Sequence, residues 1–331
     1  MINFCTLFDS NYLVKGLVMY QSLLKTCPNF HLYILAFDDL LNRTLVDMRL
    51  PHVTVISLEN FEDDELITVK PCRTAVEYMW TATPSIILYC ITKYELEHCT
   101  YIDADLCFFS NPSVLIEEMG DNDVLITPHR YSEKYDQTLT SGKYCVQFNT
   151  FKNTKNGLNI LKEWRADCIN WCYNRYEDGK RGDQMYLDSW KAKYRGVYES
   201  KHLGGGVAPW NMQQYTFTKQ KAKIRGKEIA TNNEFDLVFF HFHYIFSFKK
   251  SFLREFNFEI YDLPINVRKI IYIPYLKELI KQLIQLKKRN INIDGLATNI
   301  INKSWPAYVK LIIKRYLKKN KKIYYWISLY E

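Results

Sequence analysis

The stretch TYIDADLCFF, residues 100–109, places two carboxylates, Asp103 and Asp105, one residue apart within an otherwise apolar run. Tyr101, Ile102 and the apolar residues around them are typical of a strand inside a sheet. Side chains at positions i and i+2 of a strand share a face, so both acids are expected to point the same way where the strand ends. Two interpretations are open: a solvated Asx turn at the end of a buried strand, or a pair of ligands for a cation.

Strand and helix periods alternate in front of this stretch. The expected strands are 2–8, 31–37 and 53–58, and the expected helices are 13–25, 40–49 and a long region at about 74–97. Pro84 is expected to split the long region, with Thr81 or Thr83 capping its second piece. Strands that alternate with helices predict an α/β fold, a parallel sheet with helices on its faces.

The same alternation continues after the stretch. The expected elements are strands at 123–127, 145–151 and 235–246, helices at 156–176, 182–190, 274–289 and 304–320, and a loop at 204–211. We divide the chain at about residues 110 and 248, with a helical extension over 249–331.

The composition is that of a globular protein with a sizeable core. Of the 331 residues, 47% are apolar and 24% are charged. No apolar run reaches the ~20 residues that span a bilayer, and the start, MINFCTLFDSNYLVKG, predicts a mature cytosolic N-terminus and no signal peptide. The nine cysteines form no CxxC motif, and Cys168 and Cys172 are assigned to helix packing. Reduced thiols in a cytosolic protein are therefore expected.

The basic charge is concentrated in the C-terminal tail. From Lys249 onward there are 18 Lys and Arg against 6 Asp and Glu, whereas residues 1–248 hold 26 and 30. The tail mixes clustered lysines with Leu, Ile, Trp and Tyr, as does an amphipathic helix on an anionic bilayer. The alternative is a helix that packs on the preceding domain with a solvated basic face. No nucleic-acid motif accompanies the charge, so no nucleic-acid partner is expected.

A second group of potential ligands follows another apolar strand. His241 and His243 share one face of the run LVFFHFHY. In an open α/β sheet, ligands collect at the carboxyl ends of the parallel strands. Two carboxylates with an imidazole suit Mn²⁺ or Mg²⁺, and the histidine favours Mn²⁺. The sequence leaves open which of the two histidines would bind.

The ordered set of motifs resembles the GT-A glycosyltransferases. Strand–helix repeats lead to DAD, then to FN at 148–149, DQ at 183–184, PWN at 209–211 and a strand histidine. The likeness covers about residues 1–250 and is strongest to glycosyltransferase family 8 and related bacterial surface-polysaccharide transferases. It implies a Rossmann-like fold with a nucleotide-binding half at about 1–110 and an acceptor half at about 111–248. It also implies a cytoplasmic enzyme, which the basic tail would hold at the inner face of the plasma membrane.

The resemblance also implies roles for individual residues. It assigns the metal to Asp103, Asp105 and His241 or His243, and the anomeric carbon of the sugar to Asp183 and Gln184. It assigns the nucleotide donor to a further set: Asp9, Asn11, Tyr12, Arg73, Asp103, Asn149 and Asn211. The implied reaction transfers a sugar from a nucleoside diphosphate, UDP by resemblance, to a saccharide or lipid-linked acceptor with retention. An inverting displacement becomes possible if Asp183 is a general base.

The sequence departs from the pattern of this family at two positions. The family's histidine is usually followed by a glycine and then by Lys-Pro-Trp, which cradles the phosphates, whereas Tyr244 replaces the glycine here. The glycine that the family places two residues after FN is replaced by Phe151.

A phosphohydrolase of the haloacid dehalogenase type is one rival function. It would also place DxD at a strand end, but Cys107 and the polar run before Gly182 disagree with its motifs. A non-catalytic nucleotide-sugar-binding protein is the other rival.

Overall fold

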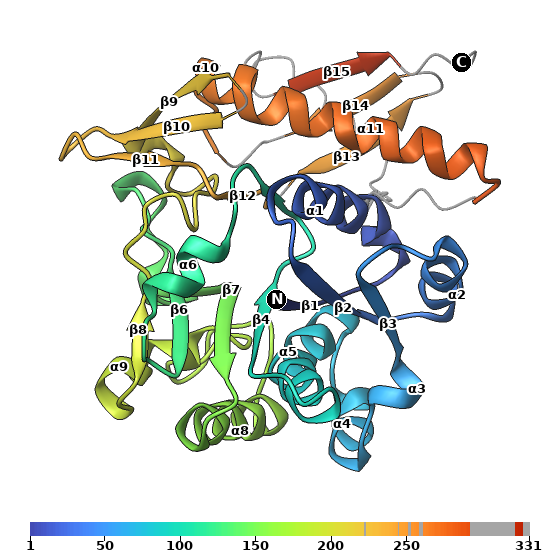
Figure 1. Ribbon diagram of the computed structural model, residues 1–331, viewed down its shortest axis with the longest axis vertical. Helices are drawn as coiled ribbons and strands as arrows, with labels where there is room; N and C mark the ends of the chain where they lie inside the picture. Colours follow the sequence, from blue (N-terminus) through green and yellow to red (C-terminus); the bar gives the residue numbers. More distant parts are fainter. Residues whose placement is uncertain (222, 244, 251–252, 258–260, 292–321, 327–331) are drawn as a thin grey trace, which may run out of the picture.

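A seven-stranded central sheet organises the protein (Figure 1). The computed structural model describes residues 1–221, 223–243, 245–250, 253–257, 261–291 and 322–326. The strand order across the sheet is β3 (Val53–Ser57), β2 (Phe30–Ala36), β1 (Ile2–Phe8), β4 (His98–Ile102), β7 (Tyr144–Lys152), β6 (Val124–Pro128) and β8 (Val197–Glu199). β7 runs antiparallel to both neighbours, and the other strands of this sheet share one direction. The α/β prediction is confirmed.

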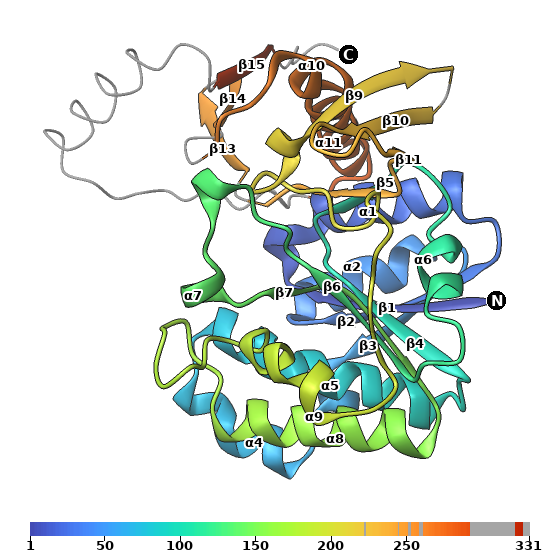
Figure 2. The same ribbon diagram turned by 90° about the vertical axis from the view of Figure 1, so that its left-hand side faces the viewer.

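Helices cover both faces of the sheet (Figure 2). On one face lie α1 (Leu13–Thr26), α2 (Asp39–Met48) and α6 (Ser113–Glu118), and on the other α5 (Ala75–Lys93) and α8 (Lys155–Asn170). Shorter helices fill the connections: α3 (Leu58–Phe61), α4 (Asp64–Val69), α7 (Thr138–Ser141), α9 (Trp190–Lys193) and α10 (Ile265–Val267). The sheet therefore separates two apolar cores, because its strands are buried on both sides.

The long helix α5 corrects one prediction, since it continues through Pro84. Its capping box is formed by Thr74 and Glu77, where the sequence led us to expect the helix to start. Thr81 and Thr83 lie buried inside the helix, and their hydroxyls donate to the carbonyls of Glu77 and Met79. Packing against α8 and β1 holds the helix together despite the proline, so Thr81 and Thr83 are not caps.

Three other boundaries differ from the prediction. α8 ends at Asn170, six residues early, because Trp171 is extended. The segment 182–190 forms a 3-10 turn, η4 (Met185–Ser189), before α9. The single strand expected at 235–246 is divided into β11 (Glu234–Asp236), β12 (Phe239–His241) and β13 (Phe246–Lys250). Local sequence does not reveal such breaks, because each piece pairs with a different partner strand.

A second layer lies against α1, on the side away from α5 and α8 (Figure 1). It contains the hairpin of β9 (Tyr215–Gln220) and β10 (Lys223–Glu228) with β11, and the sheet of β13 with β14 (Leu253–Asn257) and β15 (Lys322–Trp326). Helix α11 (Ile273–Lys288) confirms the helix expected at 274–289, whereas the helix expected at 304–320 lies outside the described residues. The extension is thus not purely helical, because three strands belong to it or border it.

The apolar face of α11 is buried against the protein itself. Tyr275, Leu276, Leu279 and Leu286 are nearly inaccessible and belong to the same core as α1. Of the two interpretations of the basic tail, packing on the domain therefore holds for this helix. No described helix is both long and apolar enough to cross a membrane.

Candidate active site

The two acids of the DAD motif follow directly from the end of β4. The Asp103 N–H donates to the carbonyl of Gln147 on β7, 3.1 Å away, so the neighbouring strand fixes where the turn begins. The Leu106 N–H then donates back to the Asp103 carbonyl at 3.2 Å. A tight turn thus carries both carboxylates, and the chain continues into a short strand, β5 (Leu106–Phe108).

A long-range strand pair brings the histidine to this turn. β5 pairs antiparallel with β12, and His241 stands opposite Leu106 in the register. The next N–H, that of Phe242, donates to the Asp105 carbonyl at 3.0 Å. One ligand atom each of Asp103, Asp105 and His241 lie within 4.8 Å of one another. The Asp–His cluster, as we call these three residues, therefore joins segments more than 130 residues apart in the chain.

The imidazole of His241 is oriented by contacts at both of its nitrogens. Its Nε2 lies 3.1 Å from Asp105 Oδ1 and 3.7 Å from Asp103 Oδ2. Its Nδ1 lies 2.8 Å from Gln147 Oε1, which accepts the Nδ1 proton. A hydrogen bond of this kind fixes the tautomer of a metal-binding histidine and leaves Nε2 for the metal. Gln147 escaped the sequence analysis, because nothing in its local pattern distinguishes it from other residues of the strand.

The electrostatics of the cluster couple two carboxylates to one imidazole. Burial opposes ionisation of Asp105, but the charge of His241 and the hydrogen bond from it hold the pKa of Asp105 well below its usual range. Burial also opposes protonation of His241, yet Asp105 and Asp103 raise its pKa well above 6.5. Burial, with the negative charge of Asp105, raises the pKa of Asp103 to about 6. The proton on His241 Nε2 therefore occupies the position from which a divalent cation would neutralise the negative charges of both acids.

The second histidine of the motif has a different environment. Burial and the charge of His241 lower the pKa of His243 to about 3, so its ring is neutral at neutral pH. The ring lies 5.5 Å from that of Trp210 and 5.6 Å from that of His241. Of the two alternatives that the sequence left open, His241 is the one that meets both acids.

A second group with metal-binding side chains lies within the core. Cys5, Cys90 and Cys99, which we call the Cys cluster, come from β1, α5 and β4 and are each fully buried. Burial raises the pKa of the Cys5 and Cys90 thiols well above the ordinary value, so they stay protonated. The expectation of reduced, packed cysteines is consistent with this environment.

Asp183 lies close enough to the Asp–His cluster to feel its charge. Burial, followed by the negative charge of Asp103, raises the pKa of Asp183 to about 7. Tyr101 is sensitive to both acids, since burial and then the charges of Asp103 and Asp183 raise the pKa of its hydroxyl well above the ordinary value. The neighbouring Gln184 instead turns its amide nitrogen to the carbonyl of Ser141.

The residues predicted to meet the nucleotide base flank the start of α1. Asp9 accepts from the Asn11 N–H at 3.1 Å, so both residues close the turn η1 (Ser10–Tyr12). The ring of Tyr12 lies 4.0 Å from the ammonium of Lys15. Lys15, which the sequence analysis did not select, approaches Asp105 Oδ2 to 3.9 Å.

Two other residues that the sequence assigned to the nucleotide donor form hydrogen bonds to backbone carbonyls and hold those segments in place. Arg73 lies over the ring of Tyr173 and donates to the Ile169 carbonyl at 3.1 Å. The Asn211 amide donates to the carbonyls of His129 and Gly206, and so fixes the loop that contains PWN.

Asn149, on β7, is the exception among these predicted contacts. Its Oδ1 accepts from the Thr127 N–H at 3.3 Å. Its Nδ2 is buried without a hydrogen-bond partner within the described part of the chain. Asn149 therefore keeps a donor group that the fold does not use.

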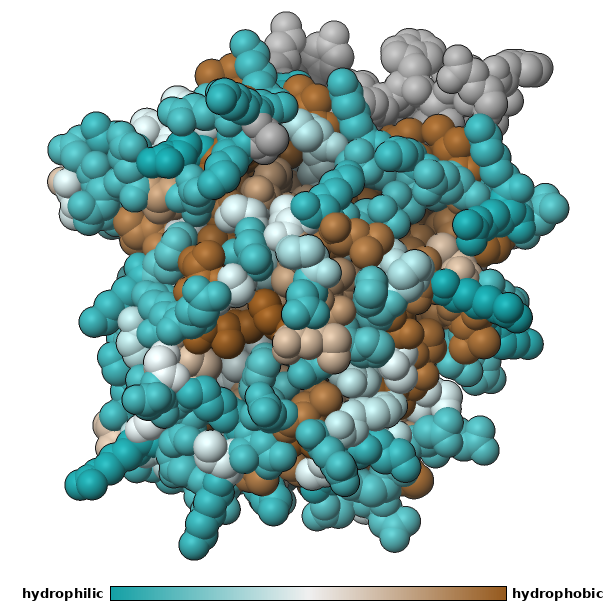
Figure 3. All heavy atoms as spheres, viewed as in Figure 1, coloured by the Kyte–Doolittle hydropathy of each residue, from teal (hydrophilic) through white to brown (hydrophobic). Residues whose placement is uncertain are grey.

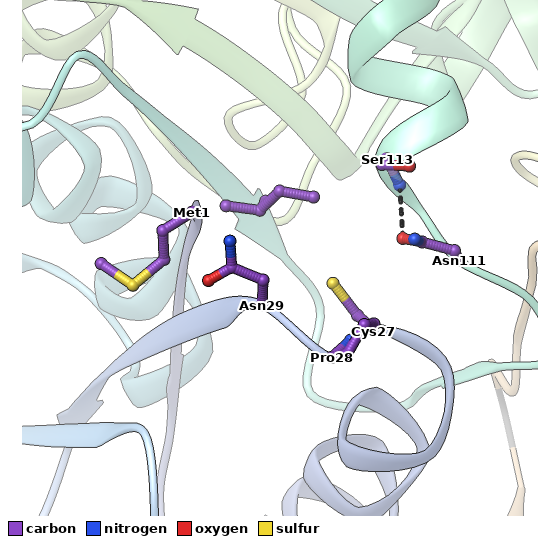
Figure 4. Close-up of a pocket in the computed structure, with 7 residues that line it drawn as sticks. Met1, Cys27, Pro28, Asn29, Asn111 and Ser113 are labelled. Atoms are coloured by element: carbon purple, nitrogen blue, oxygen red, sulfur yellow. Dashed lines mark hydrogen bonds between the residues drawn. The ribbon is translucent and has the colours of Figure 1, made fainter.

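A hollow of about 200 Å³ lies elsewhere on the protein (Figure 4). Met1, Asn29 and Asn111 line it, so it opens at the amino ends of the parallel strands β1 and β2. The Asp–His cluster lies at the carboxyl end of the parallel strand β4. The hollow is mostly apolar and stands at the opposite edge of the sheet from the chemistry.

Two proteins of Bacillus subtilis (strain 168) are similar in sequence along most of the chain. YfnD is 31% identical over 288 residues, covering 84% of this chain and 88% of its own. YfnF is 29% identical over 248 residues, covering 72% and 80%. No family model matches the chain.

Solved glycosyltransferase structures share a looser likeness. The galactosyltransferase LgtC in complex with donor and acceptor sugar analogues matches 84% of this chain and 95% of its own, with 11% identity and a TM-score of 0.49. Mouse xyloside xylosyltransferase 1 matches 63% and 87%, with 13% identity and a TM-score of 0.40. Likenesses of this degree carry no information about chemistry.

Proposed function

We propose that the chain, which belongs to the same protein family as YfnD of Bacillus subtilis, is a metal-dependent glycosyltransferase. The proposed reaction moves a sugar from a nucleoside diphosphate, UDP in the first instance, to a saccharide or lipid-linked acceptor of the bacterial cell surface. The observation that carries the proposal is the convergence of Asp103, Asp105 and His241 at the carboxyl edge of the sheet.

The donor set of this cluster fits Mn²⁺ or Mg²⁺. Carboxylate oxygens suit both ions, and the imidazole favours Mn²⁺. A divalent cation bound there would neutralise the negative charge that develops on the departing diphosphate. Asp103 and Asp105 would hold it, and Gln147 would keep His241 Nε2 directed at it.

The pKa of Asp183 supports the assignment of this residue to the side of the site that binds the sugar. Its pKa of about 7 means that its carboxyl can exchange a proton near neutral pH. We propose retention, in which the leaving phosphate accepts the proton of the acceptor hydroxyl and Asp183 lies beside the sugar. An inverting enzyme would instead use Asp183 to take that proton, and NMR of the product's anomeric configuration distinguishes the two.

The other predicted contacts are part of the same proposal. The nucleotide base is assigned to Asp9, Asn11 and Tyr12. The diphosphate or sugar is assigned to Arg73, and the sugar to Asn149. Asn211 is assigned to the shape of the loop rather than to direct contact, since its amide already holds two carbonyls.

The decisive test is turnover of nucleotide sugars by the full chain. We expect slow hydrolysis of a UDP-sugar with Mn²⁺, lost on chelation with EDTA and restored by added Mn²⁺. A generic aryl phosphate is the matched substrate for the rival phosphohydrolase. Metal-dependent hydrolysis of the aryl phosphate, with nucleoside diphosphate sugars untouched, would refute the glycosyltransferase proposal.

Contact with an anionic membrane stays a proposal for the chain beyond α11. The buried apolar face of α11 does not supply it, and the face in Figure 3 presents mainly hydrophilic side chains with scattered apolar patches. Co-sedimentation of the full chain with anionic and with neutral vesicles tests this. Equal recovery with both kinds of vesicle would refute the membrane contact and leave the enzyme proposal unaffected.

The division of the chain at about residues 110 and 248 is likewise a proposal, and it rests on the sequence alone.

A further inference from the structure

Lys15 is a buried cation in the first turn of α1, next to the Asp–His cluster. Its side chain is only 5% exposed, and its ammonium lies 3.9 Å from Asp105 Oδ2 and 4.0 Å from the centre of the Tyr12 ring. Burying an ammonium is costly without a close counter-ion, and the positive end of a helix is an unfavourable place for it. Asp105 is a shared counter-ion, because it also pairs with His241. A cation in this position calls for a further anion.

Tyr275 reaches the same region from α11. Its ring stacks on Phe242, with centroids 3.5 Å apart and planes 2° apart, and the residue is 2% exposed. Its hydroxyl has no hydrogen-bond partner among the residues that the structure describes. The N–H of Phe242 donates to the Asp105 carbonyl at 3.0 Å, so the residue on which Tyr275 stacks adjoins the turn that carries the acids. Burial and then the charge of Asp105 raise the pKa of Tyr275. A buried hydroxyl without a partner is a donor that a bound acceptor would satisfy.

The charges of the region leave room for an anion once a metal is present. A divalent cation would cancel the charges of Asp103 and Asp105, and His241 would bind as a neutral ligand. Lys15 would then have lost its counter-ion, and the group of residues would carry one net positive charge. A diphosphate bridging the metal and Lys15 would compensate that charge.

We propose that Lys15 and Tyr275 anchor the diphosphate of the nucleotide donor, the ammonium by charge and the phenol by a hydrogen bond. This inference rests on the proposed function and deepens it. The chain lacks the Lys-Pro-Trp that the glycosyltransferase resemblance predicts after the histidine. The anchor therefore comes from α1 and α11, two helices that pack on each other at the edge of the site.

Calorimetric titration of the full chain with UDP, in the presence of Mn²⁺, tests the anchor. We expect Lys15→Met to weaken UDP binding by about 10- to 100-fold, because a charge-assisted contact is lost. Lys15→Arg keeps the charge and should restore part of the affinity. Tyr275→Phe should weaken UDP binding about 3- to 10-fold while the unliganded protein melts at the same or a higher temperature, since the phenol has no partner there.

Three controls separate the anchor from other effects. Uridine lacks phosphates, so its affinity should stay within about twofold of wild type in each variant. Mn²⁺ alone should bind Lys15→Met as well as wild type or more tightly, because a nearby positive charge has been removed. Lys25→Met removes an exposed lysine of the same helix and should leave UDP binding unchanged.

The outcomes distinguish failure of the proposed anchor from failure of the proposed glycosyltransferase function. If wild type binds UDP with Mn²⁺ but Lys15→Met and Tyr275→Phe bind it equally well, the anchor is wrong and the proposed function stands. If wild type itself binds neither UDP nor inorganic pyrophosphate with Mn²⁺, both are wrong. Circular dichroism checks the fold of each variant, and the Tyr275→Phe and Lys15→Arg proteins keep the test decisive if Lys15→Met is unfolded.

Discussion

The Asp–His cluster and the Cys cluster each bring three potential metal ligands within 4.8 Å, yet their surroundings differ in every other respect. The acids sit on a turn at the end of β4, and Asp103 keeps 29% of its side chain accessible. The thiols lie between α5 and the sheet with no exposed surface. The acids have charged neighbours that orient and compensate them, whereas the thiols meet mainly one another: burial raises the pKa of Cys5 and Cys90, and hydrogen bonds with these two lower the pKa of Cys99 to about 5 against the effect of burial. The two clusters therefore share the proximity of their ligand atoms and are distinguished by access and charge.

The largest expected effect comes from removing both acids. The double variant Asp103→Ala, Asp105→Ala should lose Mn²⁺ binding and lower turnover by about 10³-fold or more, because the leaving charge is no longer neutralised. The variant should also melt at a lower temperature, because the buried Lys15 and His241 lose their counter-ions, and circular dichroism checks that it is folded at the assay temperature. Titration with Mn²⁺ and an initial-rate assay measure the effect. Wild-type turnover in this variant would contradict the metal site.

The support of His241 gives the next largest effect. Gln147→Leu leaves the imidazole Nδ1 without its acceptor, so Mn²⁺ affinity should fall about 10- to 100-fold. Gln147→Asn, which keeps an amide but shortens its reach, serves as the matched comparison. Nuclear magnetic resonance of the imidazole nitrogens would report the tautomer directly. An unchanged tautomer and unchanged affinity in Gln147→Leu would remove this positioning role.

Metal affinity should depend on pH, because the proton and the cation compete for the same groups. The raised pKa of His241 means that binding releases one proton at neutral pH, and the Asp103 pKa of about 6 adds a second below that pH. Affinity for Mn²⁺ should thus fall about tenfold per pH unit near neutrality and more steeply below about pH 6. Calorimetry in buffers of different ionisation enthalpy counts the protons. A pH-independent affinity would mean that His241 is not a ligand.

The smallest effect on the site is expected from the Cys cluster. Cys99→Ala should lower the free energy of unfolding by about 1–2 kcal/mol, since it leaves a small cavity in the core. Its Mn²⁺ affinity should stay within about twofold of wild type, as the cluster makes no contribution to that site. Denaturant unfolding with and without metal measures both quantities. Loss of the metal-dependent stabilisation in Cys99→Ala would break the contrast between the two clusters.

The sequence was informative where a pattern is local and where a motif has a known order. Alternating strand and helix periods predicted the α/β sheet, and the DAD and HFH motifs identified the residues that meet in the Asp–His cluster. Pro84 misled the prediction of α5, because buried packing against α8 outweighs the local preference of a proline. Helical periodicity continued past Asn170, although the structure turns there to an extended residue.

Residues that act through long-range contacts carried no such signal. Gln147 lies within an ordinary strand pattern, and its role depends on a partner 94 positions away. Lys15 looks like a routine helix lysine, yet it is buried and lies 3.9 Å from Asp105, which is far away in the sequence. The break of 235–246 into three strands depends likewise on the partners that each piece meets. Such features need the tertiary arrangement, which a single sequence does not display.

The pairing of β12 with β5 has a consequence for how the protein is made. The ribosome delivers Asp103 and Asp105 long before His241, so a growing chain carries the two acids without their third companion. Only after residue 241 has left the exit tunnel can the β5–β12 pair close. We therefore expect nascent chains halted before that point to lack the assembled Asp–His cluster, and any ability that the cluster has to hold a cation to arise only once β12 has been made.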